Sequence, residues 1–138
     1  MLDPIIQEET TGCGIAAAAN ILGMSYAEMK AIANNMGIHA SDEGLWSDTQ
    51  YVRRMLSSQG VSTSGQETPF ISWSDLPDLA LLSIKHYHEA GKDFWHWVVF
   101  KRINDQEFVL DSASYLSSNL RQDFDAMQPK WFIEVANA

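Results

Sequence analysis

The chain has 138 residues, of which 46% are hydrophobic and 20% are charged, enough apolar sequence to form the core of one ordinary domain. Its 18 acidic and nine basic residues give a formal charge of −9, and so few scattered Lys and Arg residues argue against nucleic-acid binding. No stretch approaches the roughly 20 apolar residues of a membrane span. We therefore expect one globular domain over residues 1–138.

The N-terminal sequence MLDPIIQEETTG has no basic region, no long apolar run and no small-residue cleavage site, so it does not predict a signal peptide. The chain has a single cysteine, Cys13, which excludes an internal disulfide. Because structural disulfides are typical of oxidising compartments, their absence favours the cytoplasm.

Helical patterns fill the first half of the chain. Three helices are predicted, each followed by a glycine: residues 13–22, 26–36 and 48–59. Ser25 and Glu28 have the spacing of a capping box for the second helix. Either Ser47 or Asp48 can cap the third.

Short β-type segments fill the second half. Five strands are predicted, over residues 61–65, 79–87, 96–103, 107–113 and 130–136. A hairpin turn is expected around residues 104–105, and a single helical turn over residues 122–127. Helices followed by strands predict an α+β fold with a mostly antiparallel sheet.

Cys13 is the residue whose chemistry most needs an explanation. It stands at the start of the first predicted helix, where unpaired backbone N–H groups and the helix dipole favour a negatively charged sulfur. The thiolate is the reactive form of cysteine, so this position suits a nucleophile. A lone cysteine is also commonly a small buried hydrophobic residue, and position alone does not separate the two interpretations.

Gln7, six residues before Cys13, adds a second feature. An acyl-transfer site needs hydrogen-bond donors aimed at the developing oxyanion, and the Gln7 amide with the Cys13 backbone N–H could supply two. A glutamine in a surface loop has no such meaning by itself. The interpretation therefore depends on the pairing of the two residues.

His96 and Asp111 are the candidates for a base and its partner. His96 opens a predicted strand, where alternation places it on the same face as Val98. If the hairpin loop has two or four residues, Val98 lies opposite Asp111, and His96 and Asp111 are diagonal neighbours that can hydrogen-bond. A three-residue loop without a bulge would turn Asp111 to the other face. The alternatives are a histidine packed between its tryptophan neighbours and a turn-forming aspartate.

The remaining histidines give weaker signals. His86 and His88 lie on one face of a possible strand, but no Cys or carboxylate completes a recognisable set of metal ligands in the sequence. His39 lies in an acidic loop that lacks the ligand spacing of an EF-hand. We therefore expect no metal site and no cofactor.

Taken together, these residues resemble the C39 peptidase family, the papain-like cysteine peptidases that remove double-glycine leader peptides from bacteriocin precursors. The segment from Gln7 to Gly14 resembles the family's glutamine, five intervening residues and Cys-Gly. HWVVF resembles its His-Phe-Val-Val motif, and VLDSA its strand ending in Asp-Pro. The likeness extends through most of the chain, including the closing WFIEV.

The resemblance implies a papain-like α+β fold in which N-terminal helices pack on a mostly antiparallel sheet. It also implies a catalytic triad of Cys13 as nucleophile, His96 as general base and Asp111 as orienting acid. Gln7 is the implied oxyanion-hole residue. The expected partner is a peptide or protein substrate, with a leader peptide as one candidate.

Several features depart from the family pattern. Gly12 replaces the aspartate that commonly precedes the cysteine, Ser112 replaces the proline after Asp111, and DFWHW is unusually aromatic. The membrane and ATP-binding domains of many such peptidases are absent, so the chain is a stand-alone member or an excised domain. An acyltransferase, deamidase or toxin with the same triad, and a peptide-binding module without activity, stay open as alternatives.

Overall fold

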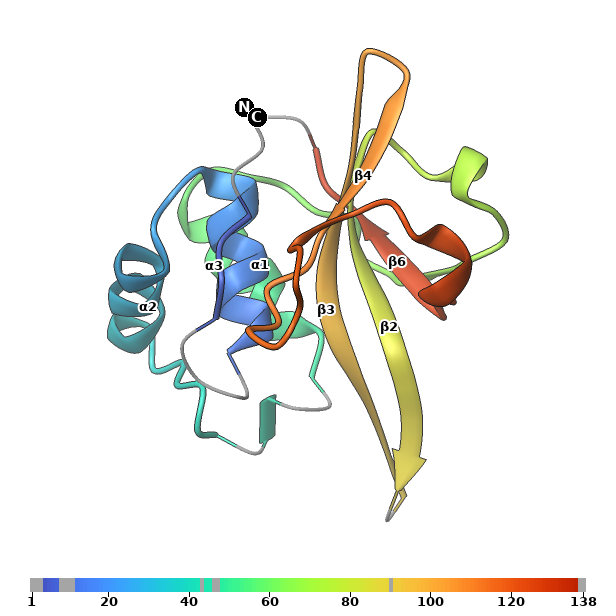
Figure 1. Cartoon of the computed structure of the whole chain (residues 1–138). Helices are drawn as coiled ribbons and strands as arrows, with labels where there is room; N and C mark the ends of the chain where they lie inside the picture. Colours follow the sequence, from blue (N-terminus) through green and yellow to red (C-terminus); the bar gives the residue numbers. More distant parts are fainter. Residues whose placement is uncertain (1–3, 8–11, 43, 46–47, 90, 137–138) are drawn as a thin grey trace.

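A computed structural model of the chain describes residues 4–7, 12–42, 44–45, 48–89 and 91–136. Three helices form a layer on one side of an antiparallel sheet (Figure 1). The helices are α1 (Cys13–Leu22), α2 (Tyr26–Asn35) and α3 (Gln50–Ser58). This arrangement confirms the predicted α+β class.

Local side-chain contacts explain where two of the helices begin. Ser25 and Glu28 form the predicted capping box of α2, since each side chain accepts a hydrogen bond from the other's backbone N–H. At the start of α3 the Asp48 carboxylate accepts a 2.7 Å hydrogen bond from the Gln50 backbone N–H. Asp48 thus lies one residue before the N-cap, which is Thr49 and has no side-chain cap hydrogen bond, and the other predicted cap, Ser47, lies outside the described residues.

Six strands form one sheet in the order β1-β6-β2-β3-β4-β5, with every neighbouring pair antiparallel. Their bounds are β1 (Thr68–Pro69), β2 (Leu79–Glu89), β3 (Lys92–Ile103), β4 (Gln106–Leu110), β5 (Leu120–Arg121) and β6 (Trp131–Glu134). The 3-10 turns η2 (Trp73–Asp75) and η3 (Phe124–Ala126) precede β2 and β6, and η3 lies within the predicted helical turn.

Two strand predictions need correction. Residues 61–65 do not form a strand. Among the described residues they make a single β-bridge, between Thr63 and Val135, just beyond the end of β6. His96 does not open its strand, since β3 begins at Lys92. The added residues pair with the far end of β2, through Tyr87 with Phe94, His88 with Asp93 and Glu89 with Lys92, and the sequence pattern left residues 88–95 unassigned.

The β3–β4 hairpin has a two-residue turn, one of the two loop lengths that the register argument allowed. Asn104 and Asp105 have φ values of 51° and 66°, as a type I′ turn demands of both central residues. Strand pairing then places Val99 opposite Leu110. Asp111 is therefore the first residue beyond β4, at the position that faces Val98.

The sheet separates two hydrophobic clusters. The larger cluster lies between the helices and one sheet face and includes Trp97, Val99 and Ile133. The smaller lies on the opposite face and includes Val98 and Phe100, with aromatic residues of η2 and η3 packed against it. The helix-side cluster determines how closely α1 approaches β3.

Small side chains allow α1 to pack tightly against its neighbours. Ala16, Ala18 and Ala19 are completely buried, so the helix has no large side chains there to hold it away from the sheet. Gly14 lies directly beneath the Tyr51 side chain of α3, and a Cβ added to Gly14 would come within 2.6 Å of a Tyr51 ring carbon. The close packing places Cys13, one residue earlier, beside the sheet.

We predict that Gly14→Ala destabilises the protein. The added Cβ overlaps the buried Tyr51 ring, and overpacking of this kind costs about 1–3 kcal/mol, more than the ~1 kcal/mol that alanine gains in helix propensity. Urea unfolding monitored by circular dichroism measures the change. Gly65→Ala is the control, because a Cβ there meets no atom within 4 Å. Equal or greater stability of Gly14→Ala would contradict the packing.

Candidate active site

Cys13 is the first residue of α1 and is partly exposed. No described side chain caps this helix, and its first turn contains no acidic residue. Within the described residues, the N–H groups of the first turn therefore have no side-chain acceptor, and no acid of that turn offsets the positive end of the helix dipole. This helix start can therefore hold a negatively charged ligand oxygen.

His96 and Asp111 meet beside the start of α1. The His96 Nε2 atom lies 2.7 Å from the Asp111 Oδ1 atom, with 14% of the His96 side chain exposed and none of the Asp111 side chain. Because an ionised carboxylate only accepts hydrogen bonds, Nε2 carries the proton in this contact. The other ring nitrogen, Nδ1, then remains for the interaction with Cys13.

Asp111 is ionised despite its complete burial. Burial by itself would raise the pKa of Asp111, but the hydrogen bonds and charges around it prevail and lower the pKa to about 2. The groups responsible are the His96 imidazole, the backbone N–H of Ala113 at 3.1 Å from Oδ1, and the Arg121 guanidinium at 2.9 Å from Oδ2. His96 therefore faces a permanent negative charge.

The charge state of His96 reflects both of its neighbours. Burial opposes the charged imidazolium, but the hydrogen bond to Asp111 and the interactions with the Cys13 side chain outweigh it and raise the pKa of His96 to about 9. The Cys13 side chain is thus near enough to His96 to affect its pKa. The arrangement favours a positively charged His96 near neutral pH, between two groups that can both be negative.

Gln7 lies near the segment that follows Asp111. Its side-chain carbonyl Oε1 accepts a 2.7 Å hydrogen bond from the Ser112 hydroxyl, and its backbone N–H donates to the Ser112 carbonyl at 3.0 Å. Both residues are buried. Ser112 thereby determines which end of the Gln7 amide is held, and the amide nitrogen is the end that can donate to a ligand.

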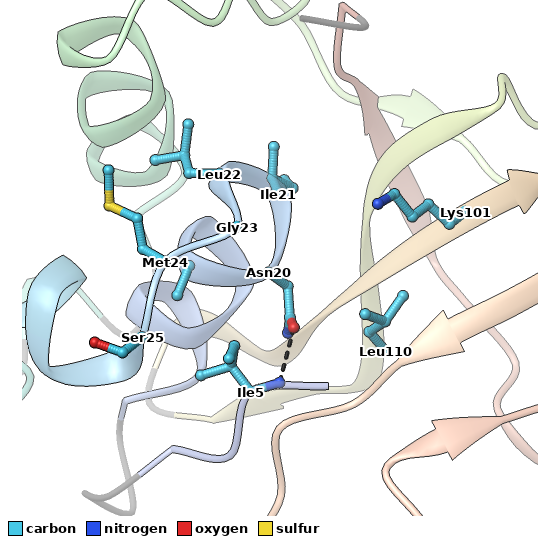
Figure 2. Close-up of a pocket in the computed structure, with 10 residues that line it drawn as sticks. Ile5, Asn20, Ile21, Leu22, Gly23, Met24, Ser25, Lys101 and Leu110 are labelled. Carbon is cyan, nitrogen blue, oxygen red and sulfur yellow. Dashed lines mark hydrogen bonds between the residues drawn. The ribbon is translucent and has the colours of Figure 1, made fainter. Parts of the chain in front are cut away.

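A second contact secures the N-terminal segment that carries Gln7. The Asn20 Oδ1 atom of α1 accepts a 2.8 Å hydrogen bond from the Ile5 backbone N–H. Figure 2 shows this bond beside the last turn of α1, in a pocket of about 510 Å³ that Lys101 and Leu110 also line. The segment is therefore attached to both α1 and the residues after β4.

Arg121, on β5, was not identified from the sequence. It contacts Asp111 through one guanidinium nitrogen and Asp123 through two others, at 2.9 Å and 2.7 Å. Ser112 was noticed only as a departure from the family pattern. Neither residue has a sequence signal of its own, although the Arg-x-Asp spacing of residues 121 and 123 is compatible with a local ion pair.

Tyr51 of α3 was also missed. Burial, and then the nearby Cys13 sulfur, raise the pKa of Tyr51, so its hydroxyl stays protonated. The neighbouring Trp97 side chain opposes this effect and lowers the pKa, and the Tyr51 ring lies above Gly14. Tyr51 thus forms part of the surroundings of Cys13 on the helix side.

The other histidines lie outside this group. His88 Nδ1 is 2.8 Å and His86 Nε2 is 3.6 Å from the same Asp93 oxygen, near the β2–β3 turn, and His39 is exposed. Within the described residues, no three His, Cys, Asp or Glu side chains are grouped as metal ligands. None of the described helices has the length and apolar character of a membrane span.

We predict that Cys13→Ala lowers the pKa of His96 from about 9 by about one unit, because it removes a hydrogen-bond partner and a potential negative charge. An NMR titration of the His96 imidazole measures this value. Ser117→Ala, in the exposed loop after Asp111, is the control and leaves the titration midpoint of His96 at the parental value. An unchanged midpoint in Cys13→Ala would show that the sulfur and the imidazole do not interact.

Two solved structures resemble the fold. The peptidase domain of Streptococcus ComA, described as a bifunctional ABC transporter involved in a quorum-sensing pathway, matches with a TM-score of 0.67 and 15% identity, over all of both chains. A double glycine motif protease from an AMS/PCAT transporter, in complex with a leader peptide, matches with a TM-score of 0.59 and 14% identity. That match covers all of this chain and 93% of the other.

Neither a protein-family model nor a curated protein sequence matches the chain. At 14–15% identity the structural likeness establishes the fold alone. The helices, the sheet and their arrangement agree over the full length of the chain. The chain therefore has the papain-like α+β fold of these two peptidase domains.

Proposed function

We propose that this protein is a cysteine peptidase that hydrolyses a peptide bond through Cys13, His96 and Asp111. The observation that carries the proposal is the 2.7 Å contact between His96 and the buried Asp111, beside the start of the helix that carries Cys13. The fold shared with two peptidase domains supports it.

The first half of the reaction would form an acyl-enzyme. The Cys13 thiolate attacks the carbonyl carbon of the scissile peptide, and the C=O electron pair moves onto the oxygen. When this intermediate collapses, the C–N bond breaks and the leaving nitrogen takes the proton from His96 Nδ1. The products of this step are a free amine and a thioester on Cys13.

The second half would release the acyl group. Neutral His96 accepts a proton from a water molecule as the water oxygen attacks the thioester carbonyl. The C–S bond then breaks, the acid product leaves, and the thiolate and imidazolium are restored. Asp111 stays ionised throughout and stabilises the imidazolium, since its pKa of about 2 lies far below that of His96.

The developing oxyanion would be stabilised by two donors. One is the backbone N–H of Cys13 at the uncapped start of α1. The other is the amide nitrogen of Gln7, whose carbonyl end is held by Ser112. Oxyanion donors of this kind are worth about 10²–10³ in kcat each.

The substrate class that we propose is an extended peptide, and a leader peptide ending in two glycines is the first to test. The protease that shares the fold was solved in complex with a leader peptide. Gly12, which precedes Cys13, adds no side-chain bulk beside the sulfur, whereas the space at Gly14 is filled by Tyr51. The proposal for this substrate rests chiefly on the shared fold.

We predict that the protein cleaves members of a peptide library and that His96→Ala lowers kcat/KM at least about a thousandfold. His88→Ala is the matched control, because His88 also contacts an aspartate at 2.8 Å but lies on an exposed hairpin. It leaves the activity unchanged. Quantitative mass spectrometry of the products measures the rates and locates the cleaved bond.

The same spectra separate the alternatives. A transferase gives a product increased by the mass of an acceptor, and a deamidase gives a gain of about one dalton. Binding of a peptide to both the parent and Cys13→Ala, without turnover by either, would indicate a non-catalytic module. Any of these three results would contradict the peptidase proposal.

We predict that Ser112→Ala lowers kcat by about tenfold with little change in KM, while Gln7→Ala lowers it by about a hundredfold. The hydroxyl of Ser112 would act only by orienting the Gln7 amide. The double variant should then be no slower than Gln7→Ala alone, which a double-mutant cycle measures. Additive losses from the two substitutions would show that Ser112 acts independently of Gln7.

A further inference from the structure

The two oxygen atoms of Asp111 have different partners. Oδ1 accepts hydrogen bonds from His96 at 2.7 Å and from the Ala113 backbone N–H at 3.1 Å. Oδ2 accepts a 2.9 Å hydrogen bond from the guanidinium of Arg121. The carboxylate is thus held on both sides, and only one of those sides faces His96.

The guanidinium of Arg121 is itself held on its other edge. Its Nε and Nη2 atoms donate to the two carboxylate oxygens of Asp123, at 2.9 Å and 2.7 Å. The Arg121 side chain is 12% exposed and that of Asp123 is 53% exposed. Asp123 therefore links the buried Arg121 guanidinium to the surface. Its two parallel hydrogen bonds have the bidentate geometry that fixes the orientation of a guanidinium.

The backbone keeps Arg121 beside Asp111. Strand β5 pairs with β4, placing Arg121 opposite Val109. The connecting loop is closed by Asn119, whose side-chain amide donates to the carbonyls of Asp111 at 2.7 Å and Ala113 at 2.8 Å. The contact between Arg121 and Asp111 thus follows from the sheet and its loop.

A buried carboxylate without a counter-charge tends to take up a proton. Asp111 is completely buried, and His96 is its only other charged contact among the described residues. A protonated Asp111 would no longer stabilise the imidazolium of His96. A carboxyl group held on only one side could also rotate and lose its alignment with Nε2.

We propose that Arg121 is a positioning residue of this site, which keeps the Asp111 carboxylate ionised and aligned with His96, and that Asp123 in turn orients Arg121. This inference rests on the proposed function of Cys13 and His96. Arg121 acts through Asp111 and does not contact the substrate.

The groups that surround Asp111 determine the sign of the pH effect. His96 faces it from β3 and Arg121 from β5, and the pKa of Asp123 beyond Arg121 is lowered chiefly by its hydrogen bond with Arg121. Cys13 of α1 acts through His96, and Tyr51 of α3 stays neutral. Removing the positive charge of Arg121 therefore raises the pH at which Asp111 takes up a proton.

We predict that Arg121→Gln raises the titration midpoint of Asp111 from about 2 by up to about one unit, as loss of a neighbouring opposite charge does. NMR of the Asp111 side-chain carboxyl carbon measures this without catalysis. The acid limb of Cys13 alkylation by iodoacetamide should move to higher pH, and kcat should fall about tenfold with KM unchanged. A merely structural role would change the melting temperature but neither pH profile.

Two further variants keep the test decisive if Arg121→Gln does not fold. Asp123→Asn retains the charge of Arg121 but removes the carboxylate that orients the guanidinium. A smaller rise of the Asp111 titration midpoint is therefore expected. Arg121→Lys should bring the acid limb of Cys13 alkylation closer to the parental pH than it brings kcat to the parental value. A lysine supplies the positive charge but cannot bind Asp111 and Asp123 at the same time as a guanidinium does. Unchanged Asp111 midpoints in all the folded variants would overturn the proposal.

Arg102→Gln is the matched control. Arg102 also bridges two carboxylates, those of Asp78 and Glu107, both at 2.9 Å, away from Cys13. Its loss should leave the Asp111 midpoint and the alkylation profile unchanged. If the parent hydrolyses no peptide but Arg121→Gln shifts the Asp111 midpoint, the proposed function fails and the assignment of Arg121 stands. If the parent is active and no variant shifts either profile, only the assignment of Arg121 fails.

Discussion

The burial of an ionised Asp111 is the constraint on which the arrangement of the site depends. Transferring a carboxylate out of water costs several kcal/mol unless hydrogen bonds and opposite charges replace the solvent. Here His96, Arg121 and the backbone N–H of Ala113 supply them. These groups come from β3, β5 and the loop after β4, so the carboxylate joins three parts of the chain. The end of the sheet is thereby held in one geometry.

Close packing of α1 against the sheet brings the start of this helix next to the charged residues His96 and Asp111. The alanines of α1 and the absence of a side chain at Gly14 bring the helix against β3 and against Tyr51. Cys13 then stands at the helix start, close enough to His96 to help raise its pKa to about 9. Packing of small residues and burial of charge are separate physical effects, and both are needed to bring Cys13 and His96 together.

The regions where prediction succeeded and failed differ in the range of the interactions involved. The capping box of α2 and the hairpin turn around Asn104 and Asp105 are local, and both were predicted from neighbouring residues, although the length of that turn stayed open. The predicted start of β3, at His96, was wrong because the residues before it pair with β2, and that pairing exists only in the folded sheet. The segment at 61–65 has strand-like residues but meets too short a stretch of partner strand to pair along its length.

By itself, the sequence predicted the α+β class and the placement of Cys13 at a helix start, and it made His96 and Asp111 neighbours on the condition of a two- or four-residue hairpin loop. These depend on periodicity, capping and turn length, which act over a few residues. Tertiary structure alone decided that Arg121 holds Asp111 and that Ser112 holds Gln7, 105 positions away. Such contacts join side chains of distant segments, and only the packing of β5, the loop after β4 and the N-terminal segment brings them within hydrogen-bond distance.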